Sequence, residues 1–194
     1  MTLRDGRRTS SSGQALHSDA RAVLAGWAPP SARDAELRER FVAHLDAHAD
    51  AMTRECLPDH LTAGAIVLTP EADAVLLNHH RKAGVWLAFG GHPEPDDATL
   101  AGVALREAHE ESGLIDLDLD PVPLDLDEHE VLFCAPGTVV HHLDVRFVAT
   151  APRGADHRVS EESLDVRWWP VDALPEIYPD MRRLIDDAVK RLQA

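Results

Sequence analysis

Residues 90–114 read GGHPEPDDATLAGVALREAHEESGL, and from residue 106 onward the stretch has the composition of the end of a helix. On a helix, Glu107, Glu110 and Glu111 lie three and four residues apart and therefore project from one face. Carboxylates stacked in this way repel one another unless a positive charge lies near them. Mg²⁺ and Mn²⁺ supply that charge, because they prefer oxygen ligands and are usually held by a few carboxylates together with substrate phosphates. The stretch therefore predicts a metal-dependent enzyme that acts on a phosphorylated substrate.

The spacing of these residues resembles the signature of the Nudix hydrolases, which reads Gly, five residues, Glu, seven residues, then Arg-Glu-(aliphatic)-x-Glu-Glu-x-Gly-(aliphatic). The matching positions here are Gly91, Arg106-Glu107, Glu110-Glu111 and Gly113-Leu114. The chain departs from the signature at Asp97, which replaces the first glutamate and lies eight residues before Arg106 instead of seven. This departure puts the detail of the loop in doubt more than the binding of metal.

The resemblance implies a role for each part of the stretch. Four groups would bind Mg²⁺ or Mn²⁺, namely Glu107, Glu110, Glu111 and the backbone carbonyl near Gly90. Glycine at position 90 lets the loop approach the metal closely. Arg106 would orient Glu110 or pair with Asp97, and would not bind phosphate itself. The alternative for the three glutamates is a solvated acidic helix face, in a chain with 34 acidic residues.

The general base stays open between two places, because Nudix proteins use either a glutamate of the signature or one in a loop before the last strand. Glu161 and Glu162 lie in such a loop, and a plain exposed acidic turn explains them equally well. For the substrate we expect contacts with Gly91 and with Trp86, whose ring can stack on a base. Trp168 and Trp169 could also stack, although at least one of the tryptophans is expected in the core.

The chain contains 12 histidines, and two of them suggest a second metal site. The segment Gly91-His92-Pro93 is similar to a Cys-Gly-His-Pro segment of isopentenyl-diphosphate isomerase, a Nudix-fold relative whose histidine binds metal. His60 also falls where that enzyme has a histidine ligand. Gly90 replaces the catalytic cysteine, so the isomerase chemistry is expected to be absent. No third histidine lies between His48 and His60 to complete a site, and the alternative is a pair of exposed loop histidines.

The composition limits the partners and the compartment. The 34 acidic residues outnumber the 19 basic ones, for a net charge of -15. Such a charge disfavours nucleic acid and anionic membrane surfaces as partners and leaves a small phosphorylated molecule, screened by metal ions. Cys56 and Cys134 are the two cysteines, so we expect no disulfide framework and a reducing compartment. The sequence lacks an apolar signal segment or membrane span, and we expect a cytoplasmic protein.

The chain is expected to contain three parts: a disordered N-terminus at 1–14, a helical extension at 15–58 and a Nudix domain at 59–194. The extension would pack on the domain or form a homodimer contact, with a substrate lid as an alternative. In the domain we expect a helix from Asp96 or Asp97 to Ser112 and a helix at 179–192. The expected strands cover residues 61–68, 74–77, 85–89, 114–126, 139–149 and 166–169. Together they would form an α/β/α sandwich with a mixed sheet and one helix on each side.

The function that we expect is hydrolysis of a phosphoanhydride bond in a nucleoside diphosphate linked to another group. One alternative is an isoprenoid-diphosphate enzyme of the same fold. Another is a non-catalytic module that senses a nucleotide to regulate a partner. The sequence does not identify the substrate, because specificity would come from loops such as Asp127 to Thr138, which carry no motif.

Overall fold

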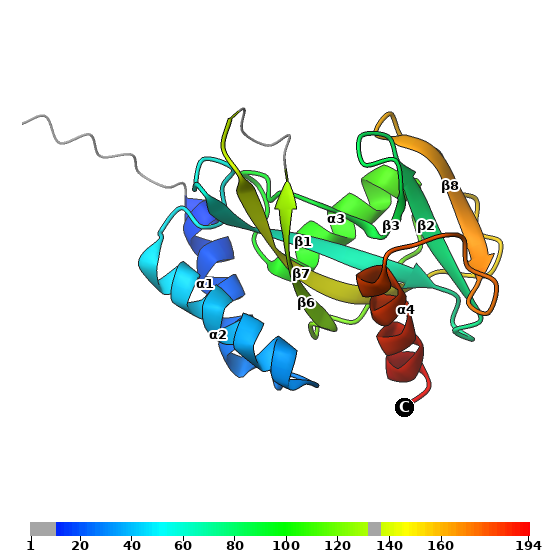
Figure 1. The fold of residues 1–194 in the computed structure, drawn as a ribbon, viewed down its shortest axis with the longest axis horizontal. Helices are drawn as coiled ribbons and strands as arrows, with labels where there is room; N and C mark the ends of the chain where they lie inside the picture. The colour runs from blue at the N-terminus through cyan, green and yellow to red at the C-terminus, as the bar shows by residue number, and fades with distance from the viewer. Residues whose placement is uncertain (1–10, 132–136) are drawn as a thin grey trace, which may run out of the picture.

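The computed structural model describes residues 11–131 and 137–194 (Figure 1). Its helices are α1 (Ser11–Gly26), α2 (Ala32–Ala47), α3 (Leu100–Ser112) and α4 (Pro179–Leu192). Its strands are β1 (Asp59–Leu68), β2 (Ala74–His80), β3 (Trp86–Leu87), β4 (Phe89–Gly91), β5 (Asp118–Leu119), β6 (Asp125–Val131), β7 (Val140–Thr150) and β8 (Ser163–Pro170). Within the described ranges, no helix combines the length and the apolar composition that a membrane span requires.

The strands form one mixed sheet in the order β3-β2-β1-β7-β5, with β4 paired to β1, β6 to β7 and β8 to β2. The long central pair β1 and β7 is parallel, and its register joins Asp59 to His141 at one end and Leu68 to Thr150 at the other. The other pairings are antiparallel. The expected mixed sheet is confirmed.

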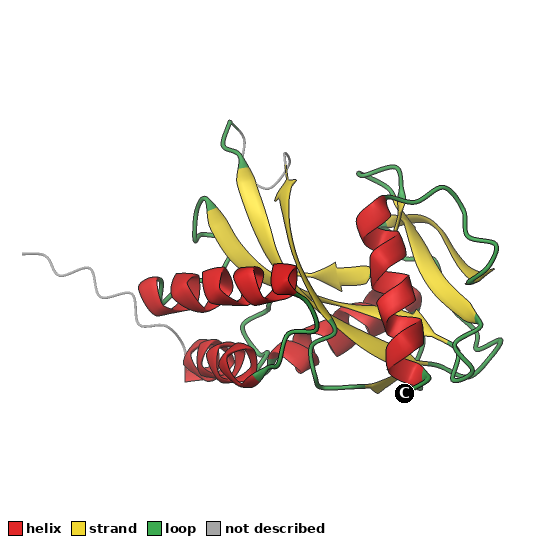
Figure 2. Cartoon of the chain, turned by 60° about the horizontal axis from the view of Figure 1, so that its bottom comes forward, coloured by secondary structure: helices red, strands yellow, loops and turns green. Residues whose placement is uncertain are grey.

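Helices cover both faces of this sheet. Alternate residues of β1 such as Ala63 and Ala65 pack into the core shared with α1, α2 and α3. Ile66 and Leu68, on the opposite face of the strand, pack into the core shared with α4. In Figure 2 helix α4 crosses in front of the strands. Successive side chains of β1 thus point to opposite faces of the sheet, and helices cover both faces, as in the expected α/β/α sandwich.

Helices α1 and α2 pack against the rest of the domain and share its hydrophobic core. Leu24 of α1 and Phe41 of α2 are fully buried in the core on the α3 side of the sheet. Ser31 caps α2, because its hydroxyl accepts a hydrogen bond from the backbone N–H of Asp34. Helix α1 begins at Ser11, so the expected disorder is wrong for residues 11–14, while residues 1–10 lie outside the described chain.

Helix α3 begins later than the sequence predicts. Its cap is Thr99, whose hydroxyl accepts from the backbone N–H of Gly102 at 3.0 Å, and not Asp96 or Asp97. The Asp97 carboxylate instead accepts from the backbone N–H of Glu94 at 2.7 Å and closes the loop before the helix. The predicted end of the helix is confirmed, because Gly113 adopts the left-handed conformation with φ 70°.

The predicted strand at 114–126 is wrong. Only the short β5 and the first residues of β6 lie in this range, and Pro121 and Pro123 lie between them. Proline lacks the N–H that a central strand must donate, so the alternation of apolar and acidic residues does not extend into a ladder. Residues 85–89 are likewise divided between β3 and β4, and β8 begins at Ser163 rather than 166.

The expected specificity loop from Asp127 to Thr138 is also partly wrong. Residues 127–131 belong to β6, where Asp127 is buried. Residues 132–136, including Cys134, lie outside the described chain.

Candidate active site

The loop that leads into the site depends on a close approach of two strands. Gly64 of β1 pairs with Gly90 of β4. A Cβ on Gly64 would lie 2.5 Å from the carbonyl oxygen of Phe89, and one on Gly90 would lie 2.8 Å from the Cα of Gly64. Both positions therefore require glycine, and Gly64 is a residue that sequence reasoning missed. The approach places the Gly90 N–H 3.1 Å from the Glu111 carboxylate, to which it donates.

Gly91 leaves room for a carboxylate of α3. A Cβ at this position would lie 2.7 Å from the carboxyl carbon of Glu107, so any other residue here would displace that side chain. The contact of Gly91 with substrate stays a prediction, and its contact with Glu107 gives an independent reason for glycine. The loop and the helix thus fit together at Gly90, Gly91, Glu107 and Glu111.

The carboxylates of α3 lie in different environments. Glu111 is buried and Glu107 nearly so, whereas the side chain of Glu110 is 56% exposed. Burial, together with the charges of Glu107 and Glu162, raises the pKa of Glu111 to about 8, although hydrogen bonds from the Gly90 N–H and the Asn78 amide oppose the shift. Burial also raises the pKa of Glu107, although the charge of Arg106 opposes the shift. Negative charge is therefore crowded here beyond what the protein neutralises.

The three glutamates do not converge on a single point. They are not among the described clusters whose ligand atoms all lie within 4.8 Å of one another. Arg106 Nη1 donates to Glu107 at 3.0 Å and to Glu110 at 3.1 Å, while Glu111 is bonded to Gly90. Such separation is expected of like charges, and a divalent cation among these oxygens would lower their pKa values. The donor set, hard oxygens with excess negative charge, fits Mg²⁺ or Mn²⁺.

Arg106 fastens the loop to the helix. Its Nη2 donates to Asp97 at 2.9 Å and to the backbone carbonyl of His92 at 3.0 Å. The pairing with Asp97 that the resemblance implies is therefore present. It forms although Asp97 is shorter than the glutamate of the signature and is separated from Arg106 by one residue more. The guanidinium is committed to protein acceptors, in agreement with a supporting role.

The structure distinguishes the two loop glutamates. The charge of Glu162 raises the pKa of Glu107 and of Glu111, so this carboxylate lies within electrostatic range of both. Arg81 holds the loop in place through its backbone N–H to the carbonyl of Glu162 at 2.8 Å and its Nε to the carbonyl of Glu161 at 3.0 Å.

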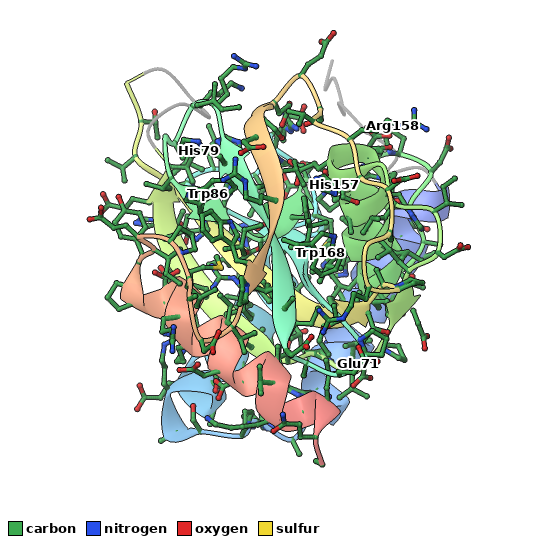
Figure 3. All side chains as sticks on the ribbon, turned by 90° about the vertical axis from the view of Figure 1, so that its right-hand side faces the viewer. Glu71, His79, Trp86, His157, Arg158 and Trp168 are labelled. Atoms are coloured by element: carbon green, nitrogen blue, oxygen red, sulfur yellow. The ribbon has the colours of Figure 1, made fainter. Side chains whose placement is uncertain are left out.

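Trp86 is part of an aromatic group beside the sheet. Its ring stacks on His79 with centroids 4.9 Å apart, and Trp169 meets it edge-on at 5.4 Å. Figure 3 shows His79 and Trp86 as neighbours on β2 and β3. Trp168 packs against the core on the α3 side, and Trp86 and Trp169 pack against the core on the α4 side. All three are partly buried, so the expectation that one of them lies inside the core is not met. His79 therefore occupies one face of the partly buried Trp86 ring, which also packs against the core on the α4 side.

An open cavity of about 440 Å³ lies between α2 and strands β6 and β7, lined by Arg33, Glu128 and His141 among others. A second cavity, of about 620 Å³, adjoins the end of α3 and is lined by Glu110, His109, Arg158 and Ser160 among others. The second cavity is therefore lined by the predicted metal ligand Glu110, by the cation Arg158 and by His109. Arg158 lies beside the end of α3 in Figure 3, and no sequence motif signalled it.

Comparison with known proteins identifies the fold. Residues 58–188 match the model of the NUDIX domain family. A NUDIX-family hydrolase from Clostridium perfringens has a similar structure, with a TM-score of 0.52, 22% identity and an alignment that covers 69% of this chain and 96% of that one.

Two further solved structures resemble this one. For a C. elegans Ap4A hydrolase the TM-score is 0.53 at 18% identity, over 69% of this chain and 97% of that one. An E. coli dihydroneopterin triphosphate pyrophosphohydrolase has a TM-score of 0.53 at 20% identity, and the alignment covers 68% of this chain and 95% of that one. Among curated proteins the chain has no significant match.

Proposed function

This chain belongs to the NUDIX family, and we propose that it uses Mg²⁺ or Mn²⁺ to cleave the phosphoanhydride bond of a nucleoside diphosphate linked to another group. The chain is a Nudix-type pyrophosphohydrolase by its family, in agreement with the sequence prediction. The observation that supports the metal dependence is the crowding of Glu107 against Gly91 and of Glu111 against Gly90, where burial and the charges of Glu107 and Glu162 raise the pKa of Glu111 to about 8.

The residues present would hold a divalent ion through Glu107, Glu110, Glu111 and the backbone carbonyl near Gly90. When bound, the ion supplies positive charge to the phosphate oxygens and to the leaving phosphate. Glu162 would accept a proton from the attacking water, since its charge acts on Glu107 and Glu111 of the same site. Arg106 keeps Glu107 and Glu110 in position through its two hydrogen bonds.

Two features support a nucleotide-derived substrate. The Trp86 ring, which is partly buried, would offer a stacking surface for a base. Arg158, in the cavity that adjoins Glu110, offers a cation for a phosphate or a polar leaving group. The fold neighbours include proteins named as acting on Ap4A and on dihydroneopterin triphosphate, and these compounds therefore belong among the first substrates to test.

The two alternative functions are less well supported. The isoprenoid-diphosphate chemistry would need a cysteine where Gly90 lies. In the described part of the chain the free cysteine is Cys56, which is buried. A nucleotide-sensing module would not need a complete set of carboxylates, and all three are present beside the candidate base.

The test is hydrolysis of a panel of nucleoside triphosphates, dinucleotide polyphosphates, nucleotide sugars and prenyl diphosphates. We expect turnover of a nucleotide substrate with Mg²⁺ or Mn²⁺, and its loss in excess chelator. Full activity in chelator would contradict the metal dependence. Tight binding of a nucleotide without turnover would favour the sensing module, and turnover of prenyl diphosphates alone would favour the isoprenoid enzyme.

The role of Glu162 has a matched control in its neighbour. Glu162→Gln should lower the rate constant by about 10²-fold while metal affinity changes little, because the change removes a base but no metal ligand. Glu161→Gln should leave the rate unchanged. Equal rates for both variants and the wild type would assign the base to a glutamate of α3.

Location and assembly are further proposals. We propose a cytoplasmic enzyme, in keeping with the free thiol of Cys56. A homodimer through the N-terminal helices also stays a proposal. Size measurement in solution decides it, and a monomer would exclude it.

A further inference from the structure

Three histidines from distant parts of the chain meet on the sheet. His60 of β1 and His142 of β7 are direct partners in the parallel register, and His92 follows the end of β4. One ring nitrogen of each lies within 4.8 Å of the other two. The ring centroids are 5.0 Å apart for His60 and His92, 5.1 Å for His60 and His142, and 4.7 Å for His92 and His142. His142 supplies the third histidine that the sequence did not reveal.

A backbone contact orients the His60 ring. Its Nδ1 lies 3.1 Å from the carbonyl oxygen of Cys56. A carbonyl only accepts hydrogen bonds, so Nδ1 carries the proton and Nε2 presents a lone pair toward His92. Metal-binding histidines are commonly fixed in this way, with the second ring nitrogen bonded to a carbonyl or carboxylate.

The spacing of the nitrogens suits a small tetrahedral ion. His60 Nε2 and His92 Nε2 are 2.9 Å apart. Two imidazoles bound to one tetrahedral Zn²⁺ at about 2.0–2.1 Å place their nitrogens about 3.3 Å apart. A shift of about 0.4 Å, with the His92 proton carried on Nδ1 in place of Nε2, would therefore convert the hydrogen-bonded pair into a pair of ligands.

A fourth histidine lies beside these three rings. His129 is different, although its ring lies 5.5 Å from that of His142. It pairs with Asp127 at 3.2 Å, and this contact helps to raise its pKa, so His129 is not part of the set.

We propose that His60, His92 and His142 bind one divalent transition-metal ion of the Zn²⁺ class, at a site separate from the glutamates of α3. Three neutral imidazoles select Zn²⁺ or Co²⁺ over Mg²⁺, which prefers oxygen, and they leave a fourth position for water or another ligand. The ion would tie β1 and β7 to the segment that directly follows Gly90 and Gly91. It would therefore hold the catalytic loop against the sheet. The proposal goes beyond the hydrolysis proposed above and does not depend on it.

A second cluster, His48, Asp50 and Cys56, also has ligand atoms within 4.8 Å, but it suits a metal less well. His48 and Asp50 are exposed, and burial raises the pKa of the Cys56 thiol to about 11. A thiol in that state is protonated at neutral pH and is a poor ligand. Replacement of Cys56 therefore distinguishes the two clusters.

The experiment measures bound metal after the full chain is incubated with Zn²⁺ or Co²⁺ and desalted. We expect about one ion per wild-type chain, visible absorption of the Co²⁺ form typical of a nitrogen-rich tetrahedral site, and a higher melting temperature with Zn²⁺. His60→Gln and His142→Gln should each weaken binding by at least about 10²-fold and lose the melting shift. Two control variants, His157→Gln at a histidine outside the cluster and Cys56→Ser, should keep both the bound metal and the melting shift.

Several results would overturn the proposal. These are a wild-type chain without bound metal, unchanged metal content in both cluster variants, and loss of metal in Cys56→Ser but not in His142→Gln. If His60→Gln does not fold, His142→Gln decides the question, because its ring is only partly buried. Glu111→Gln should retain the Co²⁺ absorption, and its loss there would place the ion among the glutamates.

Discussion

Two acidic clusters lie within the same sheet fold, and they differ in how their charge is neutralised. On β6 and β7, Asp127 and Asp144 accept from Arg146 at 3.0 Å each, and Arg33 reaches Asp127 at 2.7 Å. Arg183 Nη2 also forms an ion pair with Asp125 Oδ1 at 3.3 Å. The second cluster consists of the α3 carboxylates beside the end of β4. Arg106 is the cation that contacts them, and it donates hydrogen bonds to Asp97, Glu107, Glu110 and the backbone carbonyl of His92.

The pKa values express this difference. The arginines and His129 lower the pKa of Asp127 to about 2, and burial raises that of Asp125 only to about 6, so both are ionised at neutral pH. The pKa of Glu111 reaches about 8. A cluster neutralised from within the chain serves the fold, whereas carboxylates whose pKa is raised by burial and mutual repulsion are suited to a cation from outside. This contrast leads to four predictions.

The largest effect is expected where the neutralised cluster loses its central cation. Arg146→Leu leaves the buried Asp125 and Asp127 and the partly buried Asp144 without their shared partner and should lower the free energy of unfolding by about 3–5 kcal/mol. Urea unfolding measures it. The control is Arg153→Leu, which removes an exposed pair with Asp73 and should cost less than about 1 kcal/mol. Equal losses in the two variants would mean that the β6–β7 cluster has no special role in stability.

The opposite result is expected at Glu111. Glu111→Gln should lower turnover by about 10²-fold or more, since it removes a ligand charge, while the free energy of unfolding stays equal or rises. Stability is retained because a buried carboxylate with a raised pKa is replaced by a neutral amide. Glu71→Gln, in an exposed turn away from α3, is the control and should change neither quantity (Figure 3). A Glu111→Gln protein that unfolds more easily and keeps its turnover would reverse the assignment.

A smaller effect is expected from crowding at the loop. Gly91→Ala places a methyl group 2.7 Å from the Glu107 carboxyl carbon and should lower turnover by about 10-fold, because the ligand must shift. The control is Gly26→Ala, since a Cβ at Gly26 meets nothing within 4 Å. Steady-state kinetics of both variants provides the comparison. Wild-type turnover in Gly91→Ala would show that Glu107 need not occupy its present position.

The smallest effect is a pH dependence of stability that belongs to the neutralised cluster. The folded pKa of Asp127, about 2, lies below its ordinary value of 3.8, so its contribution is present above 3.8 and is lost as the pH falls toward 2. The stability advantage of the wild type over Asp127→Asn should shrink by about 1 kcal/mol between pH 6 and pH 3. Urea unfolding at the two pH values tests this. A constant difference would mean that Asp127 is not held ionised by its arginines.

Local spacing explains what the sequence could predict. Helix α3, its stop at Gly113 and the pairing of Arg106 with Asp97 all depend on residues within one segment. The register between parallel β1 and β7 is not local, because the two strands are far apart in the chain. The meeting of His60 with His142 was therefore hidden, as was the convergence of Arg33, Arg146 and Arg183 on Asp125.

Two errors have physical causes of the same kind. The alternation at 114–126 has the period of a strand, but Pro121 and Pro123 interrupt the ladder. Gly64 gave no local signal, because its importance lies in the approach of Gly90 from another strand. Sequence patterns report what a segment prefers, and the site depends also on what other segments bring to it.

The most direct measurement of the central claim is Mn²⁺ binding to the full chain, determined by calorimetry for the wild type, Glu111→Gln and Asp127→Asn. Zn²⁺ should be supplied first, so that the histidine cluster is filled and does not contribute. We predict that the wild type and Asp127→Asn bind Mn²⁺ with similar affinity, and that Glu111→Gln binds it at least about 10-fold more weakly. Equal affinity for all three proteins would contradict the account.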